Sequence, residues 1–138
     1  MKVHTTNYKD AFIQVADDSP AKGGEVPPVK ASEKSVATIQ FELIKDHPYK
    51  YSSDDVLFQT FATRNGISEE ELTAEREKFF SKGQACLRAS PLTKRYGWGI
   101  HSDADGKVAL VGVDSEEYKK FSSDEKLEVV KAMRSKRV

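Results

Sequence analysis

The feature that most constrains the fold is a turn sequence, Asp103-Ala-Asp-Gly106, between two runs that have the composition of β-strands. The runs are Tyr96 to His101 and Lys107 to Val113. A short turn that ends in Asp-Gly between two such runs predicts a β-hairpin. The turn also resembles part of a calcium loop, but the twelfth position of that loop would fall at Asp114, beyond a strand-like run, so its geometry fails.

Capping signals and helical apolar spacing predict four helices. The first carries Val36, Ile39 and Leu43 and stops at His47-Pro48; the second runs from Ser53 to Asn65-Gly66; the third runs from the capping box of Ser68 and Glu71 to Phe79-Phe80; the last begins near Ser122 and carries Leu127, Val130 and Met133.

Three shorter segments complete the prediction. Ala11 to Ala16 is read as a strand, although its apolar residues also fit a helical stripe. Ala85 to Ala89 is read as a short strand, and Ser115 to Phe121 as a helical turn. The order of elements predicts one domain, residues 1–138, with an α+β fold: a small antiparallel sheet of three to four strands packed against about four helices.

A long loop from Asp17 to Lys34 carries three of the five prolines and two glycines. Pro27-Pro28 does not fit a helix interior or a central strand. Loops of this length are usually functional or disordered, so the segment is either a lid or a packed surface loop.

Composition excludes several function classes. The chain has 22 bases and 22 acids, which argues against a general nucleic-acid coat or a polybasic membrane binder. Its single cysteine, Cys86, excludes an intramolecular disulfide. The N-terminus has no signal-peptide core, and the longest apolar run, Val108 to Val113, is too short for a bilayer. We therefore expect a cytoplasmic protein that does not bind a membrane.

The charges are nevertheless segregated in one window. Lys78 to Ser102 holds five Lys/Arg and no Asp or Glu. Hydroxyls and cations in the segment Ser90 to Arg95 could collect an oxyanion, although no known phosphate-loop motif is matched. The alternative is a solvated basic turn. The ligand-binding candidates in this window are Lys82, Arg88, Ser90, Thr93, Lys94 and Arg95.

Successive side chains along the predicted strand point to opposite faces, so the residues of this window fall into two groups. Tyr96, Trp98 and Ile100 point to one face and are expected in the core, whereas Arg95 and His101 point to the other. His101, beside Asp103, is the candidate catalytic acid or base, because imidazole titrates near neutrality. The alternative is a histidine at the surface end of a strand.

The C-terminus offers a second basic group, with Arg134 and Lys136 as further ligand-binding candidates. Cations there suit the end of a predicted helix. If the tail folds beside Lys94 and Arg95, the two patches merge into one anion-binding surface. The three histidines lack metal-ligand spacing, and Cys86 lies in an apolar setting that favours burial, so no metal and no cofactor are expected.

Several longer stretches point to a known family. The relevant segments are His-Thr-Thr-Asn-Tyr at 4–8, Glu-Val-Pro-Pro at 25–28, Pro-Tyr-Lys-Tyr-Ser-Ser-Asp-Asp-Val-Leu-Phe at 48–58, Phe-Phe-Ser-Lys-Gly-Gln at 79–84, the run at 88–101 and Lys-Ala-Met-Arg-Ser-Lys-Arg at 131–137. Together they resemble a family of short bacterial proteins, domain of unknown function 6157. The resemblance implies a stand-alone cytoplasmic bacterial protein, and it carries over no catalytic residues.

The sequence thus predicts a small protein that binds an anionic ligand: a nucleotide, a nucleic-acid phosphate or an organic acid. One alternative is a small enzyme in which His101 is the acid or base, Arg88 or Arg95 stabilises charge and the loop 17–34 is a lid. Another is a protein-interaction module, which would expose an apolar patch. The sequence leaves the oligomeric state open.

Overall fold

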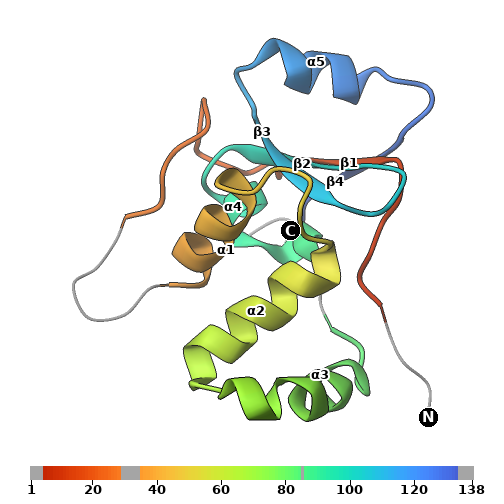
Figure 1. The fold of residues 1–138 in the computed structure, drawn as a ribbon. Coiled ribbons are helices and arrows are strands. Elements are labelled where there is room, and N and C mark those ends of the chain that lie inside the picture. Colours follow the sequence, from red (N-terminus) through yellow and green to blue (C-terminus); the bar gives the residue numbers. More distant parts are fainter. Residues whose placement is uncertain (1–4, 29–34, 85, 134–138) are drawn as a thin grey trace.

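A computed structural model describes residues 5–28, 35–84 and 86–133 (Figure 1). Its centre is a four-stranded sheet in the order β3-β2-β1-β4. The strands are β1 (Ala11–Gln14), β2 (Trp98–Ser102), β3 (Val108–Gly112) and β4 (Glu128–Lys131). β1 and β3 pair with β2 in antiparallel fashion, whereas β4 pairs with β1 in parallel. The α+β prediction is confirmed, with a mostly antiparallel sheet.

Helices cover both faces of this sheet (Figure 1). α5 lies on one side, and α1, α2 and α4 lie on the other, with α3 beyond α2. The helices are α1 (Val36–Lys45), α2 (Ser53–Asn65), α3 (Leu72–Phe80), α4 (Pro91–Lys94) and α5 (Glu116–Ser122). Two 3-10 turns, η1 (Glu69–Glu71) and η2 (Leu87–Ala89), precede α3 and α4.

The predicted hairpin forms as β2 and β3, with Trp98 opposite Gly112 and Ser102 opposite Val108. The Asp103 carboxylate fixes the turn by accepting hydrogen bonds of 2.9 Å from the amides of Asp105 and Lys107. Gly106 has a φ of 79°, a left-handed conformation that glycine adopts without a Cβ penalty.

Local caps set the helix boundaries. Ser52, one residue before the expected start, caps α2 and forms a capping box with Asp55. Gly66 ends α2 in the left-handed conformation, as its Asn-Gly signal predicts. Ser68 makes no cap to the backbone; its hydroxyl donates instead to the Glu71 carboxylate at 2.9 Å, so η1 precedes α3.

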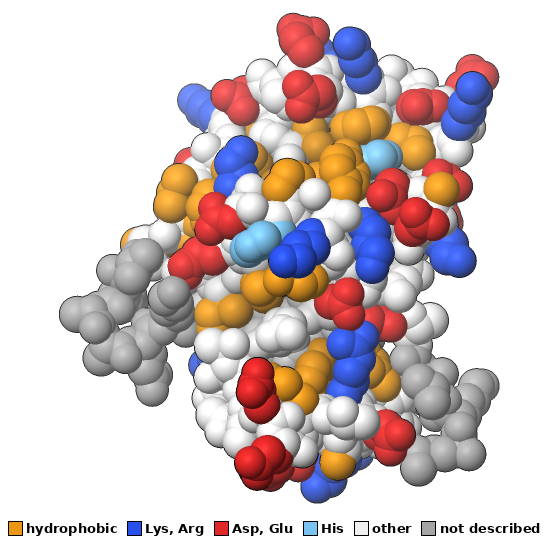
Figure 2. All heavy atoms as spheres, viewed as in Figure 1, with side chains coloured by type: hydrophobic (Ala, Val, Ile, Leu, Met, Phe, Trp, Pro, Cys, Tyr) orange, Lys and Arg blue, Asp and Glu red, His pale blue; other side chains and the backbone are white. Residues whose placement is uncertain are grey.

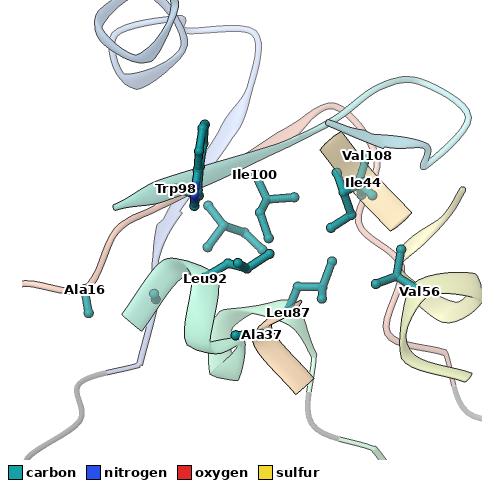
Figure 3. Close-up of a cluster of buried hydrophobic side chains, with 11 residues drawn as sticks. Ala16, Ala37, Ile44, Val56, Leu87, Leu92, Trp98, Ile100 and Val108 are labelled. Atoms are coloured by element: carbon teal, nitrogen blue, oxygen red, sulfur yellow. The ribbon is translucent and has the colours of Figure 1, made fainter. Parts of the chain in front are cut away.

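The main core lies between the sheet and α1, α2 and α4 (Figure 3). Trp98, Ile100 and Val108 approach it from the hairpin, and the helical side chains that meet them include Leu92, Ile44 and Val56. Trp98 and Ile100 are buried and Tyr96 packs against the cluster, so the core prediction for the three alternating residues is confirmed. A smaller cluster around Phe58, Ala62 and Phe80 joins α2 to α3.

The opposite face of the sheet packs against α5. Phe12 of β1 contacts Tyr118 edge-on, with ring centroids 5.1 Å apart, and also contacts Phe121 at 5.4 Å. Gly99 lies beneath these rings, and a Cβ built there would come within 2.7 Å of Phe12. The absence of a side chain at Gly99 therefore lets α5 approach the sheet.

In the described part of the long loop, residues 17–28, the segment 23–25 packs against the start of β2. Glu25 accepts a 2.8 Å hydrogen bond from the Trp98 indole through its carbonyl, and its amide donates to the Tyr96 carbonyl. Gly24 lies so close to the Trp98 ring that a Cβ would approach it to 2.6 Å. Pro27 is fully buried. These contacts fit the packed-loop alternative; residues 29–34 lie outside the described chain.

Three elements differ from the sequence prediction. The predicted helix from Ser122 is instead the end of α5 followed by β4, because residues 128–131 pair with β1. The predicted strand 85–89 contains the 3-10 turn η2. The segment Ser90 to Arg95, read as a loop, contains α4.

Candidate anion-binding site

The segment that carries Lys94 and Arg95 is held in place by Ser90. The Ser90 hydroxyl accepts a hydrogen bond of 3.2 Å from the Leu92 amide and so caps α4, with Pro91 at the first helical position. The same hydroxyl donates to Oε1 of Gln40 in α1 at 2.5 Å. α4 is therefore tied to α1 through two buried polar side chains.

Lys94 and Arg95 line a hollow of about 360 Å³ between α4 and the start of α1, named here the α1–α4 hollow. Its other lining residues come from the first turn of α1, from η2 and α4, and from the start of the hairpin: Ser35, Val36, Ala37, Ala89, Pro91 and Tyr96. None of these lining residues is an acid.

The electrostatics of this hollow favour an anion. Neither Lys94 nor Arg95 forms an ion pair with any residue in the described ranges. The first turn of α1 adds backbone amides that have no partner within the helix, and the helix dipole places partial positive charge there. Ser35 satisfies one of these amides, that of Thr38, through its hydroxyl at 3.2 Å.

Ser90 and Thr93 are placed differently from the cations. Both residues are buried, at 4% and 0% exposure. The Thr93 hydroxyl lies within hydrogen-bonding distance of the Leu87 carbonyl, 3.3 Å, and of the Ser90 carbonyl, 3.0 Å. These two hydroxyls stabilise the turn that presents Lys94 and Arg95. Neither Ser90 nor Thr93 is among the residues that line the α1–α4 hollow.

The remaining basic candidates do not gather at this hollow. Arg88 donates from Nε to the Lys131 carbonyl at 2.6 Å and so joins η2 to β4. Lys82 lines another hollow, with Phe61, Glu75, Lys78, Phe79 and Gln84, named here the α2–α3 hollow. Arg134 and Lys136 lie outside the described residues, so the merging of the C-terminal bases with Lys94 and Arg95 stays a prediction.

His101 lies on the other face of the sheet, beneath α5. Its ring stacks on Phe121 with centroids 4.1 Å apart and an interplanar angle of 6°. Its Nδ1 lies 2.8 Å from the Tyr49 hydroxyl. Burial lowers the pKa of His101 below its usual value of 6.5, and Asp103, Asp10 and Asp124 act against that effect. The imidazole is therefore held in its neutral form more strongly than a free histidine.

Two residues beside His101 have unusual backbone conformations. Asp10 and Tyr49 have φ values of 48° and 59°, in the left-handed region that residues with a Cβ rarely adopt. Burial raises the pKa of Tyr49, and Asp103 and Glu117 act in the same direction. His101 is not among the residues that line the α1–α4 hollow or the α2–α3 hollow, so neither of them supports the enzyme alternative.

Other groups of side chains give less indication of a binding site. Within residues 5–28, 35–84 and 86–133, no group of three or more His, Cys, Asp or Glu side chains could hold a metal ion. The Cys86 thiol is partly buried and lies 3.9 Å from the Tyr8 hydroxyl. Figure 2 shows acidic and basic side chains intermingled over one face of the molecule. None of the helices in the described ranges combines the length and apolar character of a membrane span.

The sequence did not predict that the first turn of α1 forms one side of the α1–α4 hollow. The start of α1 was expected, but nothing local in the sequence shows that it lies against α4. Ser90-Pro91, a capping residue followed by proline, was the one overlooked signal that a helix begins there. Gln40 was also missed, because a glutamine inside an apolar stripe gives no sign of its partner.

Residues 3–138 match the sequence profile of one protein family. This family is DUF6157, a family of unknown function. No curated protein and no solved structure matches the chain significantly.

Proposed function

Because the chain belongs to this family of unknown function, we propose its function from geometry: the protein binds an anionic ligand in the α1–α4 hollow. The observation that carries the proposal is the pairing of Lys94 and Arg95 with the first turn of α1 around one hollow that no acid lines. Charged donors and free helix amides together form a typical binding arrangement for phosphate or carboxylate.

The proposal narrows the ligand-binding set. Lys94 and Arg95 would contact the anion, and the amides of Val36 and Ala37 would approach it from α1. Ser90 and Thr93 would act by positioning these groups, since their hydroxyls are used inside the protein. Tyr96, at the rim, offers an aromatic face to a ligand with a ring.

The size of the hollow favours a small ligand. A volume of about 360 Å³ lies within the range of small-molecule pockets, roughly 300–1,000 Å³. The balance of 22 bases and 22 acids also gives no extended field that would attract a long polyanion. A nucleotide or a small organic acid therefore fits better than a nucleic-acid strand.

The test is a titration with inorganic phosphate and, separately, with citrate at low salt, followed by amide chemical shifts. The expected result is a saturable shift at Val36, Ala37, Lys94 and Arg95, lost in the double variant Lys94→Ser/Arg95→Ser. The matched control is Lys78→Ser/Lys82→Ser, which removes the same charge from the α2–α3 hollow. Equal loss in both double variants, or no saturable shift in the wild type, would refute the proposal.

A further inference from the structure

A separate hollow of about 410 Å³ lies between α1 and α2, named here the α1–α2 hollow. It shares Val36 with the α1–α4 hollow, but none of the basic candidates from the sequence lines it. The lining residues are Val36, Gln40, Leu57, Thr60, Phe61, Arg64 and Asn65.

The side-chain amide of Gln40 is a buried hydrogen-bond donor at this hollow. The residue is 2% exposed, and its Oε1 accepts the hydrogen bond from Ser90. Its Nε2 has no hydrogen-bond partner among the described residues. Gln40 is among the residues that line the hollow, so its side-chain amide is a donor without a protein partner in the described chain at that wall.

Arg64 supplies a charged donor at the same hollow. It lies in the last turn of α2 and is exposed. Its guanidinium forms no ion pair with any described residue. No acid lines the hollow, so nothing there competes with an incoming carboxylate for this group. A guanidinium matches the two oxygens of a carboxylate in a bidentate fork.

The rest of the wall is apolar or already satisfied. Val36, Leu57 and Phe61 present partly buried apolar side chains. The Thr60 hydroxyl donates to the Val56 carbonyl at 2.7 Å, and the Asn65 amide donates to the Phe61 carbonyl at 2.8 Å. The hollow thus combines an apolar surface with two free donors, one of them charged.

We propose that the α1–α2 hollow binds a small carboxylic acid with an apolar body. The carboxylate pairs with Arg64 and accepts a hydrogen bond from Nε2 of Gln40, and the apolar body packs on Leu57 and Phe61. A single cation and a single amide donor suit one carboxylate, whereas a phosphate would find more donors in the α1–α4 hollow. This site does not depend on Lys94 or Arg95, so it stands or falls separately from the proposed function.

The experiment uses phenylacetate as the probe and phenylacetamide as its uncharged partner, at millimolar concentrations, with methyl and amide chemical shifts as the readout. Phenylacetate is expected to give saturable shifts at Leu57, Val36 and the Gln40 side-chain amide. Arg64→Gln is expected to weaken its affinity about tenfold or more, because the charge-assisted pair is lost. Gln40→Glu keeps the acceptor for Ser90 but replaces the donor with a charge that repels the carboxylate, so binding should also be lost.

The control is Lys120→Gln, which removes one positive charge from the exposed surface of α5, lines neither the α1–α2 nor the α1–α4 hollow, and should leave phenylacetate binding unchanged. The proposal is overturned if phenylacetate gives no saturable shift at the α1–α2 hollow, or if Arg64→Gln and Lys120→Gln weaken binding equally. It is also overturned if phenylacetamide binds as tightly as phenylacetate, which would leave an apolar hollow without acid recognition.

Discussion

The Ser90 hydroxyl donates to Oε1 of Gln40 across 2.5 Å, although the two residues belong to helices that are far apart in the sequence. Both residues are buried, Ser90 at 4% and Gln40 at 2% exposure. Ser90 caps the helix that ends at Lys94, and Gln40 lines the α1–α2 hollow. This single contact therefore connects the two hollows for which ligands are proposed.

A double-mutant cycle measures that connection. Ser90→Ala should lower the free energy of unfolding by about 1–2 kcal/mol, because it removes a helix cap and leaves a buried acceptor without its donor. Gln40→Met, which keeps the length of the side chain, should cost less. The double variant should lose less than the sum of the two, as contacting residues do. Urea denaturation provides the measurement, and additive costs would contradict the coupling.

The close approach of the loop residue Gly23 to Gly97 is tested by a matched pair of glycines with positive φ. Gly97 has a φ of 77°, and a Cβ built there would meet the Gly23 carbonyl oxygen at 2.2 Å. Gly97→Ala should therefore cost about 3 kcal/mol or more, since backbone strain and overlap add. Gly66 has a φ of 61° but open space around it, so Gly66→Ala should cost only about 1–2 kcal/mol. Similar losses in both variants would show that the backbone around Gly23 moves aside.

The free energy of unfolding should decrease as the solution becomes more acidic, because His101 takes up a proton. Burial lowers the pKa of this imidazole in the folded protein below 6.5, so the unfolded chain binds the proton more readily. The stabilising contribution is complete above pH 6.5 and is lost as the pH falls from there through the lowered folded pKa. His101→Gln should remove this part of the pH dependence of the unfolding free energy, while His47→Gln should retain it. An unchanged pH profile in His101→Gln would contradict the assignment.

Asp55 should contribute to the pH dependence of stability in the same direction as His101, but at lower pH. Burial acts to raise its pKa, but hydrogen bonds from the Ser52 amide and the Arg76 guanidinium outweigh burial and hold the pKa below 3.8. The contribution of Asp55 is present above pH 3.8 and lost as the pH falls through the lowered value. Asp55→Asn should cost about 1 kcal/mol or more at neutral pH, and the difference from wild type should shrink in acid. Asp105→Asn, at an exposed turn, is the control; equal effects would contradict the role of the cap.

Local signals predicted much of the fold because their partners are close in the sequence. The hairpin of β2 and β3 depends on Asp103 and Gly106 in its own turn, and α2 ends at its own Gly66. The strand β4 was mistaken for a helix because Leu127, Val130 and Met133 also fit a helical spacing. The choice is decided by β1, which pairs Phe12 with Val129 from the opposite end of the chain.

The site was only partly predictable for the same reason. Lys94 and Arg95 stood out through the charge pattern of their own window. The first turn of α1, which completes their hollow, is visible only in three dimensions. Arg64 gave no signal at all, because a lone arginine near a helix end is what the helix dipole alone would favour.

The parallel pairing of β1 with β4 also has a consequence for folding order. β1 lies inside the sheet between β2 and β4, and both neighbours come from the last third of the chain. During synthesis the apolar segment Ala11 to Gln14 therefore leaves the ribosome long before either partner exists. Such distant pairings raise the contact order and slow folding. The nascent chain must keep β1 from pairing elsewhere until the segments that form β2 and β4 have been made.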